Sequence, residues 1–299
     1  MFIIKYRKIF VSISAILVGL SIISIAYFGI DFGIDFKGGA LLEVSFKNER
    51  PTQIFVQESL DKMDADLGSI LIQPIGEDSY SIKMKEITEI QKNEILATLG
   101  ADATETSFTS IGPSVGKELV RKSIISFILV ALGIIFFIAF SFRKVSLPVS
   151  SWKYGLIAVT ALIHDVLIPV GGFVVFSKIF GIQADTLFVV AILTTLGLSV
   201  SDTIVVFDRI RENLRIGKFK TFEETVGNSL NQVYTRSIIT SLTVFIVLIA
   251  LIIFGPESTK YFAMMLTAGM FFGTYSSIFV ASPLLVMVKN LQEKNKNVV

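Results

Sequence analysis

The sequence predicts a polytopic α-helical membrane protein with six transmembrane helices and a small α+β domain, in ferredoxin-like order, between the first two helices. Two observations carry this prediction. The 299-residue chain is 52% hydrophobic and only 17% charged, with a mean hydropathy of +0.70, which is far more apolar than a soluble domain. The apolar residues also gather in long runs, whereas the segment 31–121 has the composition of a soluble protein.

Residue usage excludes several classes of function. The net charge of +2 gives no electrostatic argument for nucleic acid as a partner. The lack of cysteine excludes disulfides and thiol chemistry, and the single histidine, His164, excludes a multi-histidine metal site within one chain. No G-x-x-x-x-G-K-[ST] loop is present, so there is no obvious ATP site. We therefore expect no cofactor, no metal and no enzymatic activity, and an ion gradient or a partner as the source of energy.

Six apolar runs are long enough to cross a membrane, because a helix needs roughly 20 apolar residues to span a bilayer core about 30 Å thick. They lie near 9–30, 123–142, 154–176, 186–207, 237–254 and 261–288. Backbone groups inside a bilayer must be satisfied internally, so each run is predicted to be a helix. Pro283 predicts a tilt or kink near the end of the last one.

The first run has features of a signal peptide. Basic residues precede it, and Ser24 and Ala26 have the spacing of a cleavage site. Its length of about 22 residues, however, exceeds the usual apolar core of a signal peptide. We interpret it as an uncleaved anchor.

Lysine and arginine concentrate in alternate loops, which predicts the orientation. The basic residues are Arg143, Lys144 and Lys153 in one loop, Arg209, Arg211, Arg215, Lys218 and Lys220 in the next, and Lys289, Lys294 and Lys296 in the tail. We therefore expect both termini on the cytoplasmic side of a multi-pass protein. The predicted divisions are 1–30 (N-terminus and first helix), 31–121 (extracytoplasmic domain), 122–288 (five helices with the cytoplasmic loop 208–236) and 289–299 (cytoplasmic tail).

The extracytoplasmic segment has the pattern of a β-α-β-β-α-β unit. Predicted strands lie at 41–46, 70–75, 80–85 and 103–111, and predicted helices at 51–63 and 88–99. Thr88 can cap the second helix, and Gly100 follows its end. At about 90 residues, such a unit can bury a modest core of its own.

Charged groups within the apolar runs are candidates for function, because each costs several kcal/mol unless it is paired or hydrated. His164 and Asp165 lie in the middle of the third run, Asp202 lies in the fourth, and Arg236 stands at the start of the fifth. Burial and a nearby arginine act in opposite directions on the proton affinity of a carboxylate, so such a pair can serve as a proton or ion relay. The alternative is a static buried pair that fixes helix register.

Glycines mark two further features. Gly269 and Gly273 form a small-xxx-small face on the sixth run, which predicts close helix packing. The pairs Gly38-Gly39 and Gly112-Pro113 stand where the extracytoplasmic domain joins the first two helices. Since glycine is permissive in φ/ψ, these residues form either a hinge or simple tight turns.

Five segments resemble the SecD/SecF family, and together they span nearly the whole chain in the expected order. They are Gly33–Gly39, with the G-x-D-F-x-G-G signature, Ile111–Leu119, His164-Asp165, Ser201–Asn213, which is the most specific, and Gly273–Ala281. The resemblance is to the SecF branch of this family, whose members are RND-type half-transporters.

The resemblance implies a bacterial cytoplasmic (inner) membrane protein that pairs with SecD in a twelve-helix unit. It further implies work with the SecYEG channel, in which the proton-motive force helps to complete translocation of a preprotein. The relay residues of the family carry over as Asp202 and Arg236, although Val233 and Tyr234 depart from the usual residues beside Arg236. Some relatives run on sodium. A non-transducing scaffold and a small-molecule exporter half are the alternatives, and the small outer domain argues against the exporter.

Overall fold

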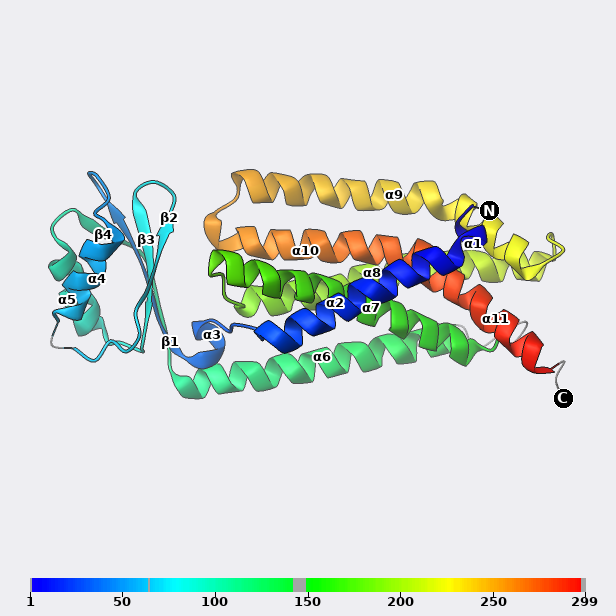
Figure 1. Cartoon of the computed structure of the whole chain (residues 1–299), viewed down its shortest axis with the longest axis horizontal. Helices are drawn as coiled ribbons and strands as arrows, with labels where there is room; N and C mark the ends of the chain where they lie inside the picture. Colours follow the sequence, from blue (N-terminus) through cyan, green and yellow to red (C-terminus); the bar gives the residue numbers. More distant parts are fainter. Residues whose placement is uncertain (1, 64, 142–148, 297–299) are drawn as a thin grey trace. The chain divides into compact units, whose positions relative to one another are not determined.

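The structure is a computed structural model, and it describes residues 2–63, 65–141 and 149–296. The chain forms two compact units (Figure 1). The helical unit contains the described residues of 1–31, 126–182 and 187–299. The α+β unit contains Phe32–Ile125 together with the short segment Gln183–Thr186, which joins two of the long helices.

The described chain has six helices that are long and apolar enough to cross a membrane. The helices outside the α+β fold are α1 (Phe2–Lys5), α2 (Arg7–Phe28), α6 (Pro113–Ser141), α7 (Ser151–Phe180), α8 (Thr186–Ile216), α9 (Phe222–Phe254), α10 (Glu257–Ser276) and α11 (Ser282–Lys296). The sixth span combines α10 and α11. The six predicted spans are thereby confirmed, and α8 and α9 extend well beyond their apolar runs.

A π-helical turn, η1 (Ser277–Ala281), interrupts the last span between α10 and α11. Pro283 follows it by two residues, near the predicted kink. Proline has no N–H, so it cannot donate to the carbonyl four residues earlier, at Phe279. A wider turn just before the proline accommodates that loss, and π turns of this kind are frequent at functional sites.

The α+β unit has the predicted β-α-β-β-α-β order. Its elements are β1 (Gly39–Phe46), α4 (Gln53–Asp61), β2 (Leu71–Ile75), β3 (Ser79–Met84), α5 (Glu89–Leu99) and β4 (Ala103–Ile111), preceded by the short helix α3 (Ile34–Lys37). The sheet order is β2-β3-β1-β4, with every pair antiparallel. This is the ferredoxin-like arrangement, and α4 and α5 cover one face of the sheet (Figure 1).

Local sequence explains how the helices of this unit begin and what they bury. The side chain of Thr88 accepts a hydrogen bond from Gln91 N, and the side chain of Gln91 accepts one from Thr88 N, which completes a capping box at the predicted position. Leu42 and Ile82 from the sheet and Ile95 from α5 are fully buried in the core between them. The unit therefore has a hydrophobic core of its own.

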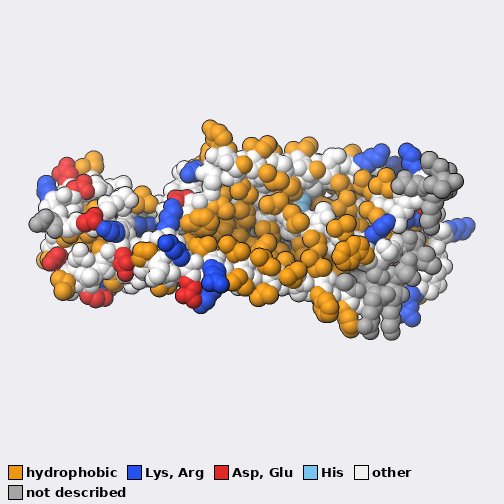
Figure 2. Space-filling model, turned by 90° about the horizontal axis from the view of Figure 1, so that it is seen from below, with side chains coloured by type: hydrophobic (Ala, Val, Ile, Leu, Met, Phe, Trp, Pro, Cys, Tyr) orange, Lys and Arg blue, Asp and Glu red, His pale blue; other side chains and the backbone are white. Residues whose placement is uncertain are grey.

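Apolar side chains cover the face of the long helices that Figure 2 shows, and lysine and arginine side chains lie toward the ends. Phe136 is 73% exposed and Phe254 is 86% exposed, values that suit contact with lipid and not with water. The chain is thus a multi-pass membrane protein. Arg143 and Lys144, which contributed to the predicted orientation, lie outside the described residues.

Candidate functional site in the transmembrane bundle

Helices α8 and α10 fit together through residues spaced four apart on each helix. A Cβ added at Gly269 would clash with Thr195 Oγ1, and one added at Gly273 would lie 3.0 Å from Ser199 Cβ. One turn further, Thr203 Oγ1 lies 2.9 Å from Ser277 Oγ. Small residues on α10 and η1 thus let a row of hydroxyls on α8 approach closely.

Gly269→Ala is expected to destabilise this contact, because the added methyl group would clash with the side chain of Thr195 on α8. We expect the free energy of unfolding to fall by about 1–3 kcal/mol, the usual cost of overpacking. Thermal unfolding of the protein in detergent measures this loss as a lower midpoint temperature. Thr195→Ala in the same chain should restore much of the loss. Gly197→Ala is the control, since its Cβ would meet no atom within 4 Å. Equal stability of the Gly269 and Gly197 variants would contradict the packing argument.

Asp165 lies at the centre of a buried polar cluster that joins α7, α8 and α10. Its side chain is fully buried. One carboxylate oxygen, Oδ2, accepts hydrogen bonds from Ser276 Oγ at 2.7 Å and from Ser199 Oγ. The other oxygen lies 2.8 Å from His164 Nδ1. Oxygen atoms from three helices therefore meet at one point inside the bundle.

His164 completes this cluster and faces aromatic rings. Its imidazole is 4% exposed and stacks on Tyr275, with an interplanar angle of 15° and a centroid distance of 6.2 Å. Nδ1 is engaged with Asp165, while Nε2 is buried with no hydrogen-bond partner among the described residues. Among the described residues, Asp165 is therefore the hydrogen-bond partner of the imidazole.

Asp202 accepts a hydrogen bond from a hydroxyl group of α10, which in turn contacts a hydroxyl group of α9. Thr274 Oγ1 donates to Asp202 Oδ2 at 3.3 Å, and Thr274 in turn lies 2.6 Å from Ser241 Oγ. Ser241 donates to the backbone oxygen of Ser237 at 2.8 Å. A chain of hydroxyls therefore leads from Asp202 to the backbone of α9.

Arg236 lies near enough to Asp202 to act on it electrostatically, but in the described part of the chain the two form no ion pair within 4.0 Å. Its side chain is exposed and lines an open cavity of about 300 Å³ between α8 and α9. Charged residues of both signs line this cavity, including Asp208, Arg209 and Glu212. Arg236 thus lines a polar opening and lies within electrostatic reach of Asp202.

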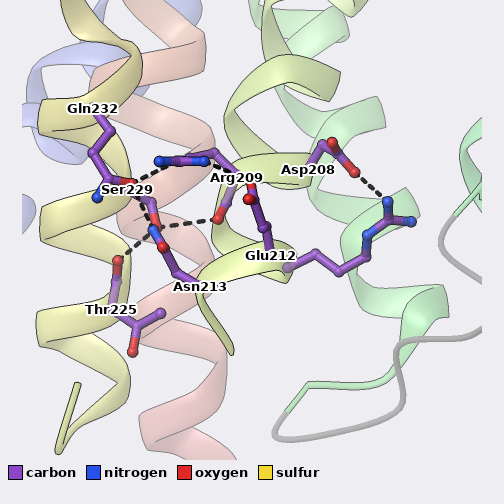
Figure 3. Close-up of polar contacts among 8 residues, drawn as sticks. Asp208, Arg209, Glu212, Asn213, Thr225, Ser229 and Gln232 are labelled. Carbon is purple, nitrogen blue, oxygen red and sulfur yellow. Dashed lines mark hydrogen bonds and ion pairs between the residues drawn. The ribbon is translucent and has the colours of Figure 1, made fainter. Parts of the chain in front are cut away.

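A hydrogen-bond network braces α8 against α9 beside this opening (Figure 3). Gln232 Oε1 accepts from Arg209 Nε at 2.6 Å and from Asn213 Nδ2 at 2.8 Å, and Asn213 also donates to Ser229 Oγ at 2.8 Å. Asp208 forms an ion pair with Arg211. The segment 208–215, predicted from sequence to lie in a cytoplasmic loop, is thus a helical continuation of α8 that packs on α9.

The structure places the four predicted relay residues in two groups, Asp165 with His164 and Asp202 near Arg236. Sequence reasoning missed the hydroxyls that hold them, although the four-residue spacing on α8 was a visible signal. No three His, Cys, Asp or Glu side chains are grouped for a metal ion within the described ranges. Carboxylate and hydroxyl oxygens around Asp165 and Asp202 are nevertheless groups that a proton or a hard monovalent cation would use.

The four predicted junction residues lie inside the α+β unit, close to one another. Gly38 and Gly39 have φ values of +82° and +138°, which favour glycine. A Cβ at Gly38 would lie 2.9 Å from Pro113 Cα, and one at Gly112 would lie 3.3 Å from the carboxylate of Glu86. The backbone therefore turns tightly here, and a hinge at these residues stays a prediction.

Two family models match the chain, and each includes residues of both units. The model of the C-terminal region of the protein-export membrane proteins SecD and SecF matches residues 91–291, and the model of the SecD/SecF GG motif matches residues 23–49. The chain belongs to the SecD/SecF family. The first match includes Asp165, Asp202 and Arg236, and the second includes the double glycine Gly38-Gly39.

Individual SecD/SecF proteins agree with this assignment over nearly full length. The protein translocase subunit SecF of Thermobaculum terrenum is 40% identical, over 96% of this chain and 94% of its own. The SecF subunit of Anaerolinea thermophila is 34% identical, over 97% and 94%. The crystal structure of SecDF from Thermus thermophilus, described as a translocon-associated membrane protein, is 27% identical with a TM-score of 0.82. That match covers 96% of this chain but only 38% of SecDF.

Proposed function

We propose that this chain is an accessory subunit of the Sec translocase which, together with SecD, uses the proton- or sodium-motive force to promote late steps of preprotein translocation across the bacterial cytoplasmic membrane. The observation that carries the proposal is the setting of Asp202. Its carboxylate lies among transmembrane helices and accepts a hydrogen bond from a neutral hydroxyl, without a cation within 4.0 Å among the described residues. A carboxylate in this setting can exchange an ion without breaking an ion pair.

In this proposal Asp202 is the main titrating group. Arg236 stabilises the charged state of Asp202 when the arginine approaches. Asp165 and His164 form a second, buried site for the ion. A change of charge at Asp202 alters what Thr274 and Ser241 can donate to, and those hydroxyls belong to α10 and α9. Ion exchange would therefore shift three helices relative to one another, with no covalent catalysis and no cofactor.

The partner in this proposal is SecD. The SecDF chain is much longer than this chain, which matches only 38% of it, so a second subunit would supply the remainder. SecYEG and the translocating preprotein follow from the same proposal. We also propose that both termini face the cytoplasm and that the α+β unit lies outside. Because the chain has no cysteine, single cysteines at Glu77 and at Lys294 can be labelled from either side to check this orientation. Labelling of Lys294→Cys from outside would contradict it.

Preprotein translocation into inverted membrane vesicles tests the function. Vesicles with and without this chain are compared with the proton gradient intact, with it collapsed, and with a sodium gradient in its place. We expect the chain to raise translocation only when one of the two gradients is present. An equal rise without any gradient would support the scaffold, and uptake of small solutes without an effect on preproteins would support an exporter.

We further propose that the sheet and helices of the α+β unit move during translocation, with Gly38-Gly39 and Gly112-Pro113, which lie inside the unit, as the hinge. Disulfide cross-linking of this unit to the helical unit should then reduce translocation, because the motion is blocked, while assembly with SecD is unchanged. The comparison is the same double-cysteine protein after reduction. Unchanged translocation in the fully cross-linked protein would rule the motion out.

A further inference from the structure

The segment Gln183–Thr186 comprises the end of the α7–α8 loop and the first residue of α8. It is part of the α+β unit, and we name it the strap. It lies far along the chain from the rest of that unit. Ala184, at its centre, is fully buried, although it belongs to a short connection between two membrane-spanning helices. Burial of a loop residue requires partners for its backbone groups, since an unpaired buried amide or carbonyl costs free energy.

The segment just before the double glycine supplies these partners. Phe32 and Ala184 form a parallel β-bridge, and Gly33 N–H donates to the backbone oxygen of Ala184 at 2.8 Å. A Cβ at Gly33 would come within 3.3 Å of that oxygen, so glycine permits the close approach. From the sheet, Lys83 Nζ donates to Gln183 Oε1 at 3.0 Å. The strap is therefore held by backbone and side-chain contacts together.

Asp35 makes a further contact with the strap. Its Oδ2 accepts two hydrogen bonds from Thr186, one from the backbone N–H and one from Oγ1, both at 2.7 Å. Thr186 is the first residue of α8, where backbone N–H groups have no partner inside the helix. A carboxylate at this end also interacts favourably with the helix dipole. Asp35 thus caps α8 from a position 151 residues earlier in the chain.

We propose that Asp35 is a positioning residue that seats the strap and fixes the start of α8 for ion coupling. Helix α8 runs from Thr186 to Ile216 with no proline, and it carries Asp202 sixteen residues after its first residue. At 1.5 Å per residue this is about 24 Å of continuous helix. A rigid helix transmits a displacement of its first turn along its length, so the seating of the strap affects where Asp202 stands. The effect on coupling rests on the proposed function, whereas the seating itself does not.

Cysteine trapping tests the seating in the full-length protein in membranes. Phe32→Cys and Ala184→Cys are introduced as the only two cysteines, at a bridged pair with the close backbone spacing that a disulfide needs. We expect rapid disulfide formation on oxidation. Asp35→Ala should slow it by about tenfold, the factor expected for losing hydrogen bonds to a charged acceptor. Glu77→Ala, an exposed carboxylate in the same unit, should leave the rate unchanged.

Single and double variants of Asp35 and Thr186 distinguish loss of this contact from a general loss of stability. Thr186→Val removes only the hydroxyl bond to Asp35, so its effect on trapping should be smaller than that of Asp35→Ala, and the double variant should be no slower than Asp35→Ala alone. Asp35→Asn keeps an acceptor and should fall between wild type and Asp35→Ala. Equal trapping rates in all these variants would overturn the proposal.

Translocation into inverted vesicles then separates seating from coupling. We expect Asp35→Ala to reduce the gradient-dependent part of translocation severalfold and to leave the gradient-independent part at the wild-type rate. If Asp35→Ala slows disulfide formation but leaves gradient-dependent translocation at the wild-type rate, Asp35 seats the strap but has no positioning role in ion coupling. If the wild-type chain itself gives no gradient-dependent translocation, the proposed function fails, and the trapping result still stands.

Discussion

Asp202→Asn is expected to abolish the gradient-dependent part of preprotein translocation and to leave the gradient-independent part unchanged. Asparagine has nearly the shape of aspartate but does not bind or release a proton near neutral pH. Its amide oxygen can still accept the hydrogen bond from Thr274, so the packing around α8 is kept. The measurement compares translocation into inverted vesicles with the gradient present and collapsed, at matched amounts of protein.

Asp208→Asn is the matched control for this variant. It makes the same chemical change on the same helix, at an exposed carboxylate that pairs with Arg211 at the end of α8. We expect a normal response to the gradient, because surface ion pairs contribute little. Asp202→Glu, which keeps an ionisable group, should retain part of the response. A normal response in Asp202→Asn itself would remove the relay and favour the scaffold.

Asp165→Leu is expected to destabilise the helical unit strongly. The substitution removes the acceptor of Ser199 and Ser276 and the partner of His164, all of them buried. Each buried donor left without a partner costs roughly 1–3 kcal/mol. Thermal unfolding in detergent and the amount of protein in the membrane should therefore both fall well below those of the wild type.

Asp165→Asn distinguishes the structural role of this cluster from an ionic one. The amide oxygen can accept from Ser199 and Ser276, and the amide N–H can donate to the unprotonated Nδ1 of His164. We therefore expect stability within about 1 kcal/mol of the wild type, together with loss of gradient-dependent translocation. A stable Asp165→Asn protein with a full gradient response would show that the cluster fixes helix register only.

The fold was predictable from local pattern because its signals are local. Runs such as 186–207 are long enough to require a spanning helix, and Thr88 with Gln91 marks a helix start without any tertiary information. The relay candidates were equally visible, since Asp165 and Asp202 are charged residues in apolar surroundings. Each of these predictions needs only residues within about one helix length.

The partners of those charges required the tertiary structure. Asp165 meets Ser199 and Ser276 across 34 and 111 residues of sequence, and nothing in the hydropathy of a spanning helix indicates which face meets which neighbour. The same holds for Arg236, whose distance from Asp202 depends on how α8 and α9 are braced.

The seating of the strap lies furthest from any sequence signal. Gly33 and Ala184 contact each other through backbone atoms, which every residue possesses, and the side chain of Asp35 contacts a residue 151 positions away. Apolar length and helix caps are properties of a segment and can be read from its residues. A contact between backbones exists only once two distant segments are side by side, so only the folded chain reveals it.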